Sequence, residues 1–174
     1  MIQLCKMSAE AFLSFKTFSI TDYAEDLAKG KGLRREEALA AAERDFDQQL
    51  PLGPDTPDQF LMTITDPSNA SEVGWIWFSY KSENDIRQVW LNDFLIYEPA
   101  RRKGYATAAL AEMERMAKND GCAVCSLFVW DHNPAGYALY ERCGYRAEQR
   151  LPGGSVLKKG LGPSRVPDPS SVRR

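Results

Sequence analysis

Histidine is almost absent from the chain, since His132 is the only one among 174 residues. A metal site built on two histidines is therefore excluded within one chain, and a serine–histidine–aspartate triad would have to use His132. The sequence also lacks the Gly-x-Ser-x-Gly turn that presents the serine in many hydrolases. A zinc enzyme or a serine hydrolase is therefore a poor match to this sequence, and we expect no metal cofactor.

Long apolar runs are missing as well. The longest, residues 73–78, is far shorter than the roughly 20 residues that cross a membrane. The first residues contain no apolar segment of the secretory-signal type. We therefore expect a cytoplasmic protein that binds no membrane.

Only four cysteines are present, at positions 5, 122, 125 and 143. Cys122 and Cys125 have the spacing of a Cys-x-x-Cys site, but they fall in a segment that reads as a buried strand. Residues three apart on a strand point to opposite faces, and no second pair completes a zinc site. We expect structural thiols, with a redox or zinc site as the alternative.

The net charge is only −2, which argues against a nucleic-acid-binding surface. The charge is unevenly distributed, since residues 1–100 hold 9 basic and 17 acidic side chains, whereas residues 101–174 hold 13 and 7. An acidic half beside a basic half suits one cationic and one anionic ligand. The alternative is that these charges are only solvated helix faces and a basic tail.

The length and a hydrophobic fraction of 44% predict one α/β domain over residues 1–159, followed by a mobile tail rich in Pro, Ser and Arg over residues 160–174. Apolar periodicity and turn residues predict the elements. Strands are expected at residues 2–6, 59–65, 73–81, 86–96, 122–130, 145–149 and 155–158, and helices at 9–28, 34–49, 102–119 and 134–143. The order β-α-α-β-β-β-α-β-α-β-β predicts a mixed sheet, with an antiparallel meander followed by a βαβ crossover.

A basic turn that contains glycine stands at the start of the third predicted helix. Arg101, Arg102, Lys103 and Gly104 precede a helix N-terminus, whose free amides and dipole favour an anion. Gly104 would let that anion approach the backbone closely. The turn matches neither of the two common phosphate-binding glycine motifs, so an ordinary basic loop is the alternative from this local pattern.

Two segments carry a more specific pattern. Arg101-x-x-Gly104-x-Ala106 lies between the fourth strand and the third helix, and residues 133–145 read Asn-x-x-x-x-x-Leu-Tyr-x-x-x-Gly-Tyr. The first resembles the acyl-CoA signature of the GNAT superfamily of N-acetyltransferases, and the second is similar to a later segment of the same family. Residues 93–99 look like small bacterial members of unassigned substrate. The resemblance implies the GNAT-like acyl-CoA N-acyltransferase fold, and acetyl transfer from acetyl-CoA to a primary amine within a ternary complex.

The resemblance also implies a donor site. Arg101 adds charge, and the backbone amides after it would bind the pyrophosphate of acetyl-CoA. These amides belong to Arg102, Lys103, Gly104, Tyr105, Ala106 and Thr107. The fourth strand would diverge from the fifth at a bulge, and backbone groups of Leu95 and Ile96 would pair with pantetheine. Asn133 would hydrogen-bond pantetheine, with Tyr137 on the same helix face or, alternatively, in the core.

Tyr140 matches the family tyrosine whose hydroxyl points at the thioester sulfur. A phenol can donate a proton to the departing thiolate, and a tyrosine that only packs on the donor is the alternative. Asp93 is the carboxylate expected to accept the proton of the amine, directly or through water. Polyamine-acetylating relatives carry Glu where this chain has Asn92, so Asp93 has the alternative role of orienting water or neighbouring amides. Gly136 stands where the family prefers Ala.

Acidic and aromatic residues predict the acceptor site. A pocket between the first two helices and the third and fourth strands would suit a cationic amine. Its candidate residues are Asp22, Tyr23, Asp26, Trp75, Trp77, Trp90 and Asn92. For each tryptophan, a core position is the alternative. The expected partner is a small-molecule amine, with a peptide or protein acceptor, or a non-catalytic acyl-CoA-binding module, as alternatives, and a homodimer is left open.

Overall fold

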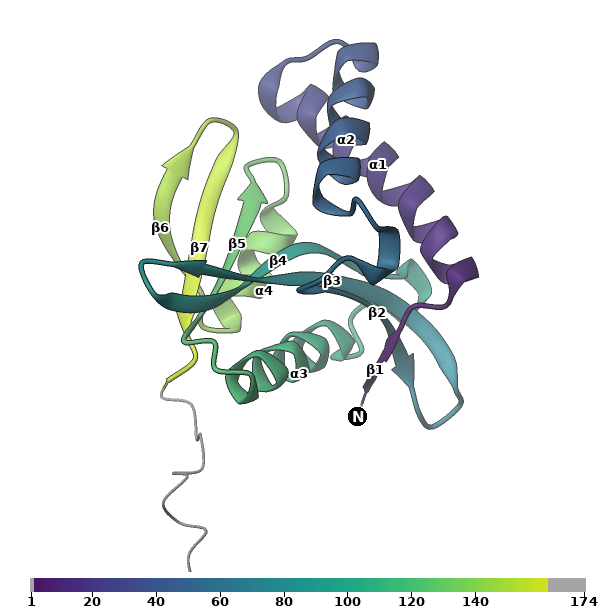
Figure 1. Ribbon diagram of the computed structural model, residues 1–174, viewed down its shortest axis with the longest axis vertical. Coiled ribbons are helices and arrows are strands. Elements are labelled where there is room, and N and C mark those ends of the chain that lie inside the picture. Colours follow the sequence, from purple (N-terminus) through teal and green to yellow (C-terminus); the bar gives the residue numbers. More distant parts are fainter. Residues whose placement is uncertain (1, 163–174) are drawn as a thin grey trace, which may run out of the picture.

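The computed structural model describes residues 2–162, and its strands form one seven-stranded sheet in the order β1-β2-β3-β4-β5-β7-β6 (Figure 1). The strands are β1 (Gln3–Lys6), β2 (Gln59–Asp66), β3 (Ser71–Glu83), β4 (Ile86–Ile96), β5 (Val124–Trp130), β6 (Arg146–Leu151) and β7 (Gly154–Gly160). The helices are α1 (Ala9–Lys31), α2 (Arg35–Gln49), α3 (Tyr105–Asn119) and α4 (Pro134–Arg142). Only β4 and β5 pair in parallel, so the predicted order of elements and the mixed sheet are confirmed.

Helices cover both faces of the sheet. The pair α1–α2 stands on one face and α3 lies along the other (Figure 1). Alternation along β3 divides the core between them, because Trp75 and Trp77 pack with the α1–α2 residues, whereas Ile76 and Phe78 pack with Leu110 of α3. The two tryptophans therefore belong to the core. A core position was the alternative that the sequence left open for each of them.

The helix α1 is longer than predicted. Ser8 caps its start by accepting a hydrogen bond from the Ala11 amide at 3.1 Å, and Gly32, with a φ of 67°, ends it. The prediction ended this helix at residue 28, because Gly30 reads as a breaker. Gly30 is instead helical, and the Trp130 ring packs directly against it. A Cβ at this position would lie only 2.2 Å from that ring.

Three other boundaries differ from the prediction. The helix α3 begins at Tyr105 and not at residue 102, because Arg102 and Gly104 have left-handed backbones with φ of 59° and 85°. Strand β5 begins at Val124 and not at residue 122. Strand β7 runs to Gly160, one residue past the predicted end of the domain, and residues 163–174 of the predicted tail lie outside the described part of the chain.

The strands β4 and β5 pair for only part of their length. Their parallel ladder ends at Leu91, which lies opposite Leu127. The next residue, Asn92, has no partner on β3, which makes it a bulge in β4. Past this bulge the two strands separate, and the resulting gap positions the functional site.

All four cysteines are free. Burial raises the pKa of the Cys125 thiol to about 12, so this thiol is protonated at neutral pH, and it lies 3.1 Å from the Tyr145 hydroxyl. These are properties of a core residue and not of a nucleophile. Within residues 2–162, no helix is both long and apolar enough to cross a membrane.

Candidate active site

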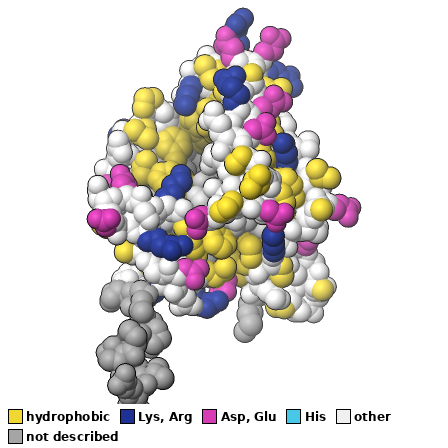
Figure 2. All heavy atoms as spheres, in the orientation of Figure 1, with side chains coloured by type: hydrophobic (Ala, Val, Ile, Leu, Met, Phe, Trp, Pro, Cys, Tyr) yellow, Lys and Arg dark blue, Asp and Glu magenta, His cyan; other side chains and the backbone are white. Residues whose placement is uncertain are grey.

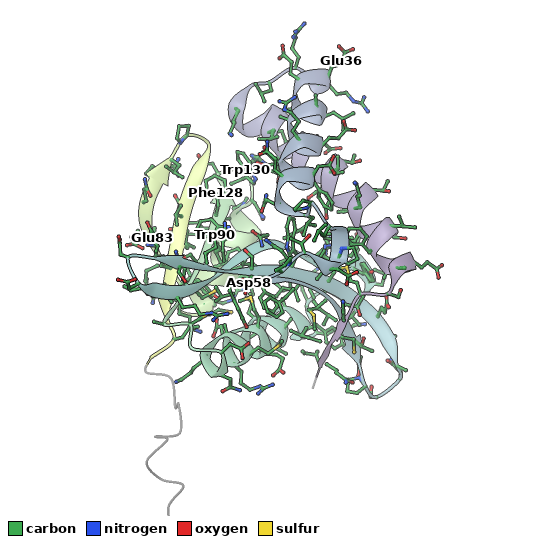
Figure 3. All side chains as sticks on the ribbon, viewed as in Figure 1. Glu36, Asp58, Glu83, Trp90, Phe128 and Trp130 are labelled. Atoms are coloured by element: carbon green, nitrogen blue, oxygen red, sulfur yellow. The ribbon has the colours of Figure 1, made fainter. Side chains whose placement is uncertain are left out.

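A cavity of about 680 Å³ lies where β4 and β5 diverge, beneath α1 and α2. Its walls combine carboxylates with aromatic rings. They include Ser19, Asp22, Tyr23, Asp26, Asp45, Trp77, Trp90, Asn92, Asp93, Phe128, Trp130, Asn133 and Tyr140. In Figure 3, Trp90, Phe128 and Trp130 lie on the side of the gap that faces α2, and Figure 2 shows apolar side chains gathered on the surface beside that helix.

Asp93 is held rigidly on β4, directly after the bulge. The Ser19 hydroxyl of α1 donates to its Oδ2, and the Trp75 indole Nε1 donates to its Oδ1 at 3.4 Å. Burial raises the pKa of Asp93, while these two donors and the Phe94 amide oppose that rise. The side chain is thus an oriented carboxyl whose proton affinity is higher than that of an exposed aspartate.

Tyr140 enters the same cavity from α4. Asn133 caps this helix by accepting a hydrogen bond from the Gly136 amide at 2.9 Å, and Pro134 occupies its first turn. No other described residue hydrogen-bonds the Tyr140 hydroxyl. Burial, and then the charge of Asp93, raise the pKa of Tyr140, so its hydroxyl is protonated at neutral pH and free to donate.

The start of α3 presents unpaired backbone donors. The first bond of the helix runs from the Ala108 amide to the Gly104 carbonyl at 3.1 Å, so the amides of Tyr105, Ala106 and Thr107 have no intrahelical partner. Around Gly104 the space is open, because a Cβ there would meet no atom within 4 Å. Amides, open space and a helix N-terminus together fit a phosphate group.

Side chains fix this turn to the rest of the sheet. Arg101 Nε donates to the Ile96 carbonyl of β4 at 3.0 Å, and the Tyr105 hydroxyl donates to Asp66 Oδ2, at the end of β2, at 2.5 Å. This phenol and Ser68 lower the pKa of Asp66 to about 2, so the anchor is ionised at neutral pH. Neither Arg101 nor the amides after it line the cavity, which lies at the other end of the gap.

Backbone alternation decides which groups of β4 face the gap. The Tyr97 amide donates to the Val73 carbonyl at 2.9 Å, so Ile96 and Gly74 form a non-hydrogen-bonded pair. The amide of Ile96 therefore points away from β3 and into the gap, as do the backbone groups of Phe94. Those of Leu95 point to β3, which makes Leu95 a poorer partner for pantetheine than the sequence suggested.

Most of the expected acceptor residues meet in the cavity. Asp22, Tyr23 and Asp26 face it from α1, and Trp77, Trp90 and Asn92 face it from the sheet. The remaining candidate, Trp75, is absent from its walls and contributes through its bond to Asp93. Tyr137 also lies outside the cavity and packs against the core beside α3, which is the alternative stated for it.

The aromatic and amide candidates each contact at least one neighbouring side chain. The Trp77 Nε1 donates to Gln59 at 2.7 Å, the Asn92 amide donates to the Ser79 hydroxyl at 3.0 Å, and Lys81 Nζ lies 5.3 Å from the Trp90 ring centre. These contacts orient the side chains of the sheet side of the wall. The side chain of Asn92 is thus held by Ser79, and its carboxamide cannot serve as a base.

The acidic side of the cavity, and the contacts of its carboxylates, include residues that the sequence reasoning missed. Tyr23 donates to Asp45 Oδ2 of α2 at 3.3 Å, and burial raises the pKa of Tyr23 to about 12. His132 Nε2 lies 2.6 Å from Asp26 Oδ1. Ser19 could have been found, because it shares a helix face with Asp22 and Asp26 at spacings of three and seven. Within residues 2–162, no group of three or more His, Cys, Asp or Glu side chains is arranged to hold a metal ion.

The fold and the site define a class of proteins that transfer acetyl groups. The chain belongs to the acetyltransferase (GNAT) family, whose family model matches residues 34–145. The protein is an acetyltransferase, and the resemblance in its sequence is confirmed.

Among known proteins, the chain is similar to YycN of Bacillus subtilis (strain 168), described as an uncharacterized N-acetyltransferase. The two are 34% identical over 145 residues, which cover 83% of this chain and 92% of YycN. The crystal structure of YycN superposes with a TM-score of 0.81 and covers 87% of this chain and 96% of that one. The N-acetyltransferase PaiA of Thermoplasma acidophilum, solved with coenzyme A, shares the fold with a TM-score of 0.66 at 17% identity, covering 92% of this chain and 99% of PaiA.

Proposed function

We propose that this protein transfers the acetyl group of acetyl-CoA to a primary amine of a small molecule, by direct attack in a ternary complex. The observation that carries the proposal is the separation of β4 from β5 after Leu91, which opens a cavity with Asp93 on one wall and Tyr140 on another. A carboxyl that can accept a proton and a phenol that can donate one are the two groups that such a transfer uses.

The donor would lie along the gap between the two strands. The amides of residues 102–107 and the charges of Arg101, Arg102 and Lys103 suit a pyrophosphate. The amide of Ile96 and the carbonyl of Phe94 suit pantetheine as an added strand edge, and Asn133 borders its inner end. When bound, the donor supplies an acetyl thioester, whose carbonyl carbon bonds to the amine nitrogen as its bond to sulfur breaks.

Tyr140 is the proposed acid. Its hydroxyl is protonated, has no other partner among the described residues and faces the cavity, so it can donate its proton to the sulfur that leaves. Its own high proton affinity opposes full transfer, so we infer a strong hydrogen bond to sulfur, with net protonation completed by solvent.

Asp93 is the proposed proton acceptor, directly or through a water molecule. An alkylammonium has a pKa of about 10.4 and must lose a proton before it attacks. Because burial raises the pKa of Asp93, its ionised form is a stronger base than an exposed aspartate. The amine proton passes to Asp93 or to its water, and then to solvent.

A small cationic amine is favoured because the cavity wall is acidic and aromatic. Asp22, Asp26, Asp45 and Asp93 line the cavity together with Tyr23, Trp77 and Trp90. We assign the reaction to the cytosol, since four free thiols suit a reducing compartment.

The test is thiol release from acetyl-CoA in the presence of single primary amines, with the acetylated product identified by mass spectrometry. The proposal expects stoichiometric thiol and N-acetyl product with at least one small amine. Acetyl-CoA binding without turnover of any small amine, or turnover of peptides alone, would contradict it.

A further inference from the structure

Three hydrogen-bond donors hold the carboxyl group of Asp93 on the cavity wall. The Ser19 hydroxyl of α1 donates to Oδ2, and the Trp75 indole Nε1 donates to Oδ1 at 3.4 Å. The third donor is the Phe94 amide, on β4 itself. An indole or a peptide N–H only donates, whereas a hydroxyl can give its proton away and accept another. Ser19 is therefore the one donor of the three through which a proton can reach Asp93.

The hydroxyl of Ser19 is turned away from its own helix. Two other hydroxyls of α1 donate to carbonyls four residues earlier, Thr17 to Leu13 at 3.1 Å and Thr21 to Thr17 at 2.9 Å. That bond is common for a serine or threonine inside a helix. Ser19 instead donates to a carboxylate of β4 that is 74 positions away in the chain. The orientation of its hydroxyl thus serves Asp93 and not the helix.

The oxygen of Ser19 has unused capacity to accept a hydrogen bond. A hydroxyl oxygen carries two lone pairs, and no residue in the described part of the chain donates to Ser19 Oγ. Ser19 is 5% exposed, and it is one of the residues that line the cavity. A buried polar atom is stabilised when it gains a hydrogen-bond partner. An ammonium group bound in the cavity would supply that partner.

We propose that Ser19 relays the proton of the acceptor amine to Asp93, so that the two residues act as one base. The N–H bond of the ammonium breaks and its proton bonds to Ser19 Oγ, while the proton that Oγ held bonds to Asp93 Oδ2. The electron pair stays on nitrogen, Ser19 remains a neutral hydroxyl, and Asp93 becomes a neutral carboxyl that later returns the proton to solvent. A second proton, which the nitrogen loses as the amide forms, balances the one that the thiolate gains. The proposal rests on the proposed function and deepens it by naming the path of the proton.

The charges around Asp93 favour transfer in this direction. Besides its three donors, the titratable groups that face it are Asp22 and Asp26 of α1 and Tyr140 of α4. Burial, and more weakly the charge of Asp26, raise the pKa of Asp93, so its ionised form accepts a proton more readily than an exposed aspartate does. Burial also raises the pKa of Tyr140, which therefore keeps its own proton and does not compete for that of the amine.

The test measures kcat/KM from pH 7 to pH 9 for the wild type and Ser19→Ala, with the primary alkylamine that the wild type acetylates fastest. Without the relay the amine must enter in its neutral form, whose fraction rises about tenfold per pH unit below a pKa of about 10.4. We expect Ser19→Ala to be about 10²-fold slower than the wild type at pH 7, and within about tenfold of it at pH 9. A loss by the same factor at every pH would show a role in packing alone and would overturn the relay.

Ser126→Ala is the matched control for the loss of a buried serine. Ser126 is fully buried on β5, donates to Gln88 Oε1 at 3.1 Å, and is absent from the cavity wall. Its replacement removes a comparable hydrogen bond and leaves kcat/KM unchanged at every pH. Because alanine is the best helix former, Ser19→Ala is expected to keep α1 folded, which thermal unfolding of the two variants checks.

Two further measurements separate a relay from a residue that only orients Asp93. If the two residues form one path, Asp93→Asn and the double variant with Ser19→Ala lose no more than about the same factor at pH 7 as either single variant. Losses that multiply would contradict the relay. Single-turnover rates in mixtures of light and heavy water count the protons that move in the slow step. The wild type should show one more moving proton than Ser19→Ala, and equal numbers would leave Ser19 as an orienting group and refute the relay.

The outcomes also distinguish the relay from the proposed function. Full activity of Ser19→Ala at pH 7 overturns the relay while acetyl transfer stands. Full activity of Asp93→Asn removes Asp93 as the proton acceptor, and the relay is refuted with it. If the wild type acetylates no small amine, the proposed function itself fails, and so does the role of Ser19 in it.

Discussion

The His132 imidazole Nε2 lies 2.6 Å from Oδ1 of Asp26, although the two residues are 106 positions apart in the chain. The imidazole also stacks on Trp130, with ring centres 5.6 Å apart. Asp26 belongs to α1, and His132 belongs to the loop that leads into α4 and to Tyr140. One contact therefore joins the helix that carries the acidic residues to the segment that carries the proposed acid.

Breaking this contact should weaken the fold by a small, measurable amount. Both side chains are about 30% exposed, so the pair contributes roughly 0.5–1 kcal/mol to the free energy of unfolding. A double-mutant cycle with His132→Gln and Asp26→Asn, measured by urea unfolding at neutral pH, isolates that term. Strictly additive losses would show that the two residues do not interact in solution.

The hydroxyl of Tyr140 should matter for the rate and not for binding of the donor. Tyr140→Phe removes the hydroxyl that we propose as donor to the leaving sulfur, so we expect kcat to fall about 10²-fold or more, with the acetyl-CoA dissociation constant changed less than about twofold. Steady-state kinetics with a working amine and calorimetry with acetyl-CoA measure the two quantities.

Tyr80→Phe is the matched control for the loss of a phenol. The Tyr80 hydroxyl donates to Asp120 Oδ2 at 2.8 Å, on the other side of the sheet from the cavity. Its loss should lower stability by about 1 kcal/mol and leave kcat unchanged. An unchanged kcat in Tyr140→Phe would remove Tyr140 from the chemistry.

The ionisation of Asp22 should cost stability. Its pKa is about 6 in the folded protein against an ordinary 3.8, so the folded state holds the proton more tightly than the unfolded chain does. The cost is absent below pH 3.8 and complete above about pH 6. The groups that face Asp22 are Asp26 and Glu25 on its own helix, Asp93 on β4, and Lys29, which acts in the opposite direction.

Asp22→Asn should therefore raise the Tm at pH 8, by about 2 °C, and this gain should shrink toward zero near pH 4. Thermal unfolding of both proteins across this pH range measures the difference. A gain that is independent of pH, or a loss at pH 8, would show that the carboxylate is not repelled by its neighbours.

Local patterns were sufficient to predict the order of the elements. The alternation in β3, the apolar stripe of α3 and the Asn133–Pro134 start of α4 each depend on neighbours in the sequence, and all three are found in the structure. The predicted ends of helices and strands were wrong where tertiary packing determines where an element stops. Gly30 continues a helix because its missing side chain makes room for Trp130, and no local signal shows that contact.

In the candidate site, too, local patterns predicted some features and not others. Carboxylates and aromatics at strand and helix spacing were predicted to share one pocket, and all of them except Trp75 line the same cavity, because side chains on one face of an element stay together. The partners of those residues were not predictable. The bonds of Asp93 with Ser19 and of Asp26 with His132 cross 74 and 106 positions, and the direction of the Leu95 backbone depends on a register that the bulge at Asn92 sets.

The binding of acetyl-CoA to the turn before α3 underlies the whole account, and Gly104 tests it most directly. Gly104 and Gly121 lie at opposite ends of α3 and have φ of 85° and 87°, and a Cβ added at either residue would meet no atom within 4 Å. Alanine at either position therefore costs about the same, roughly 1–2 kcal/mol of backbone strain.

The measurement is calorimetric titration of acetyl-CoA into the wild type, Gly104→Ala and Gly121→Ala. The account predicts micromolar binding to the wild type and to Gly121→Ala, and binding weakened by about tenfold or more in Gly104→Ala, because its turn no longer presents the amides to the pyrophosphate. Equal affinities in the two variants, or no binding to a folded wild type, would contradict the account.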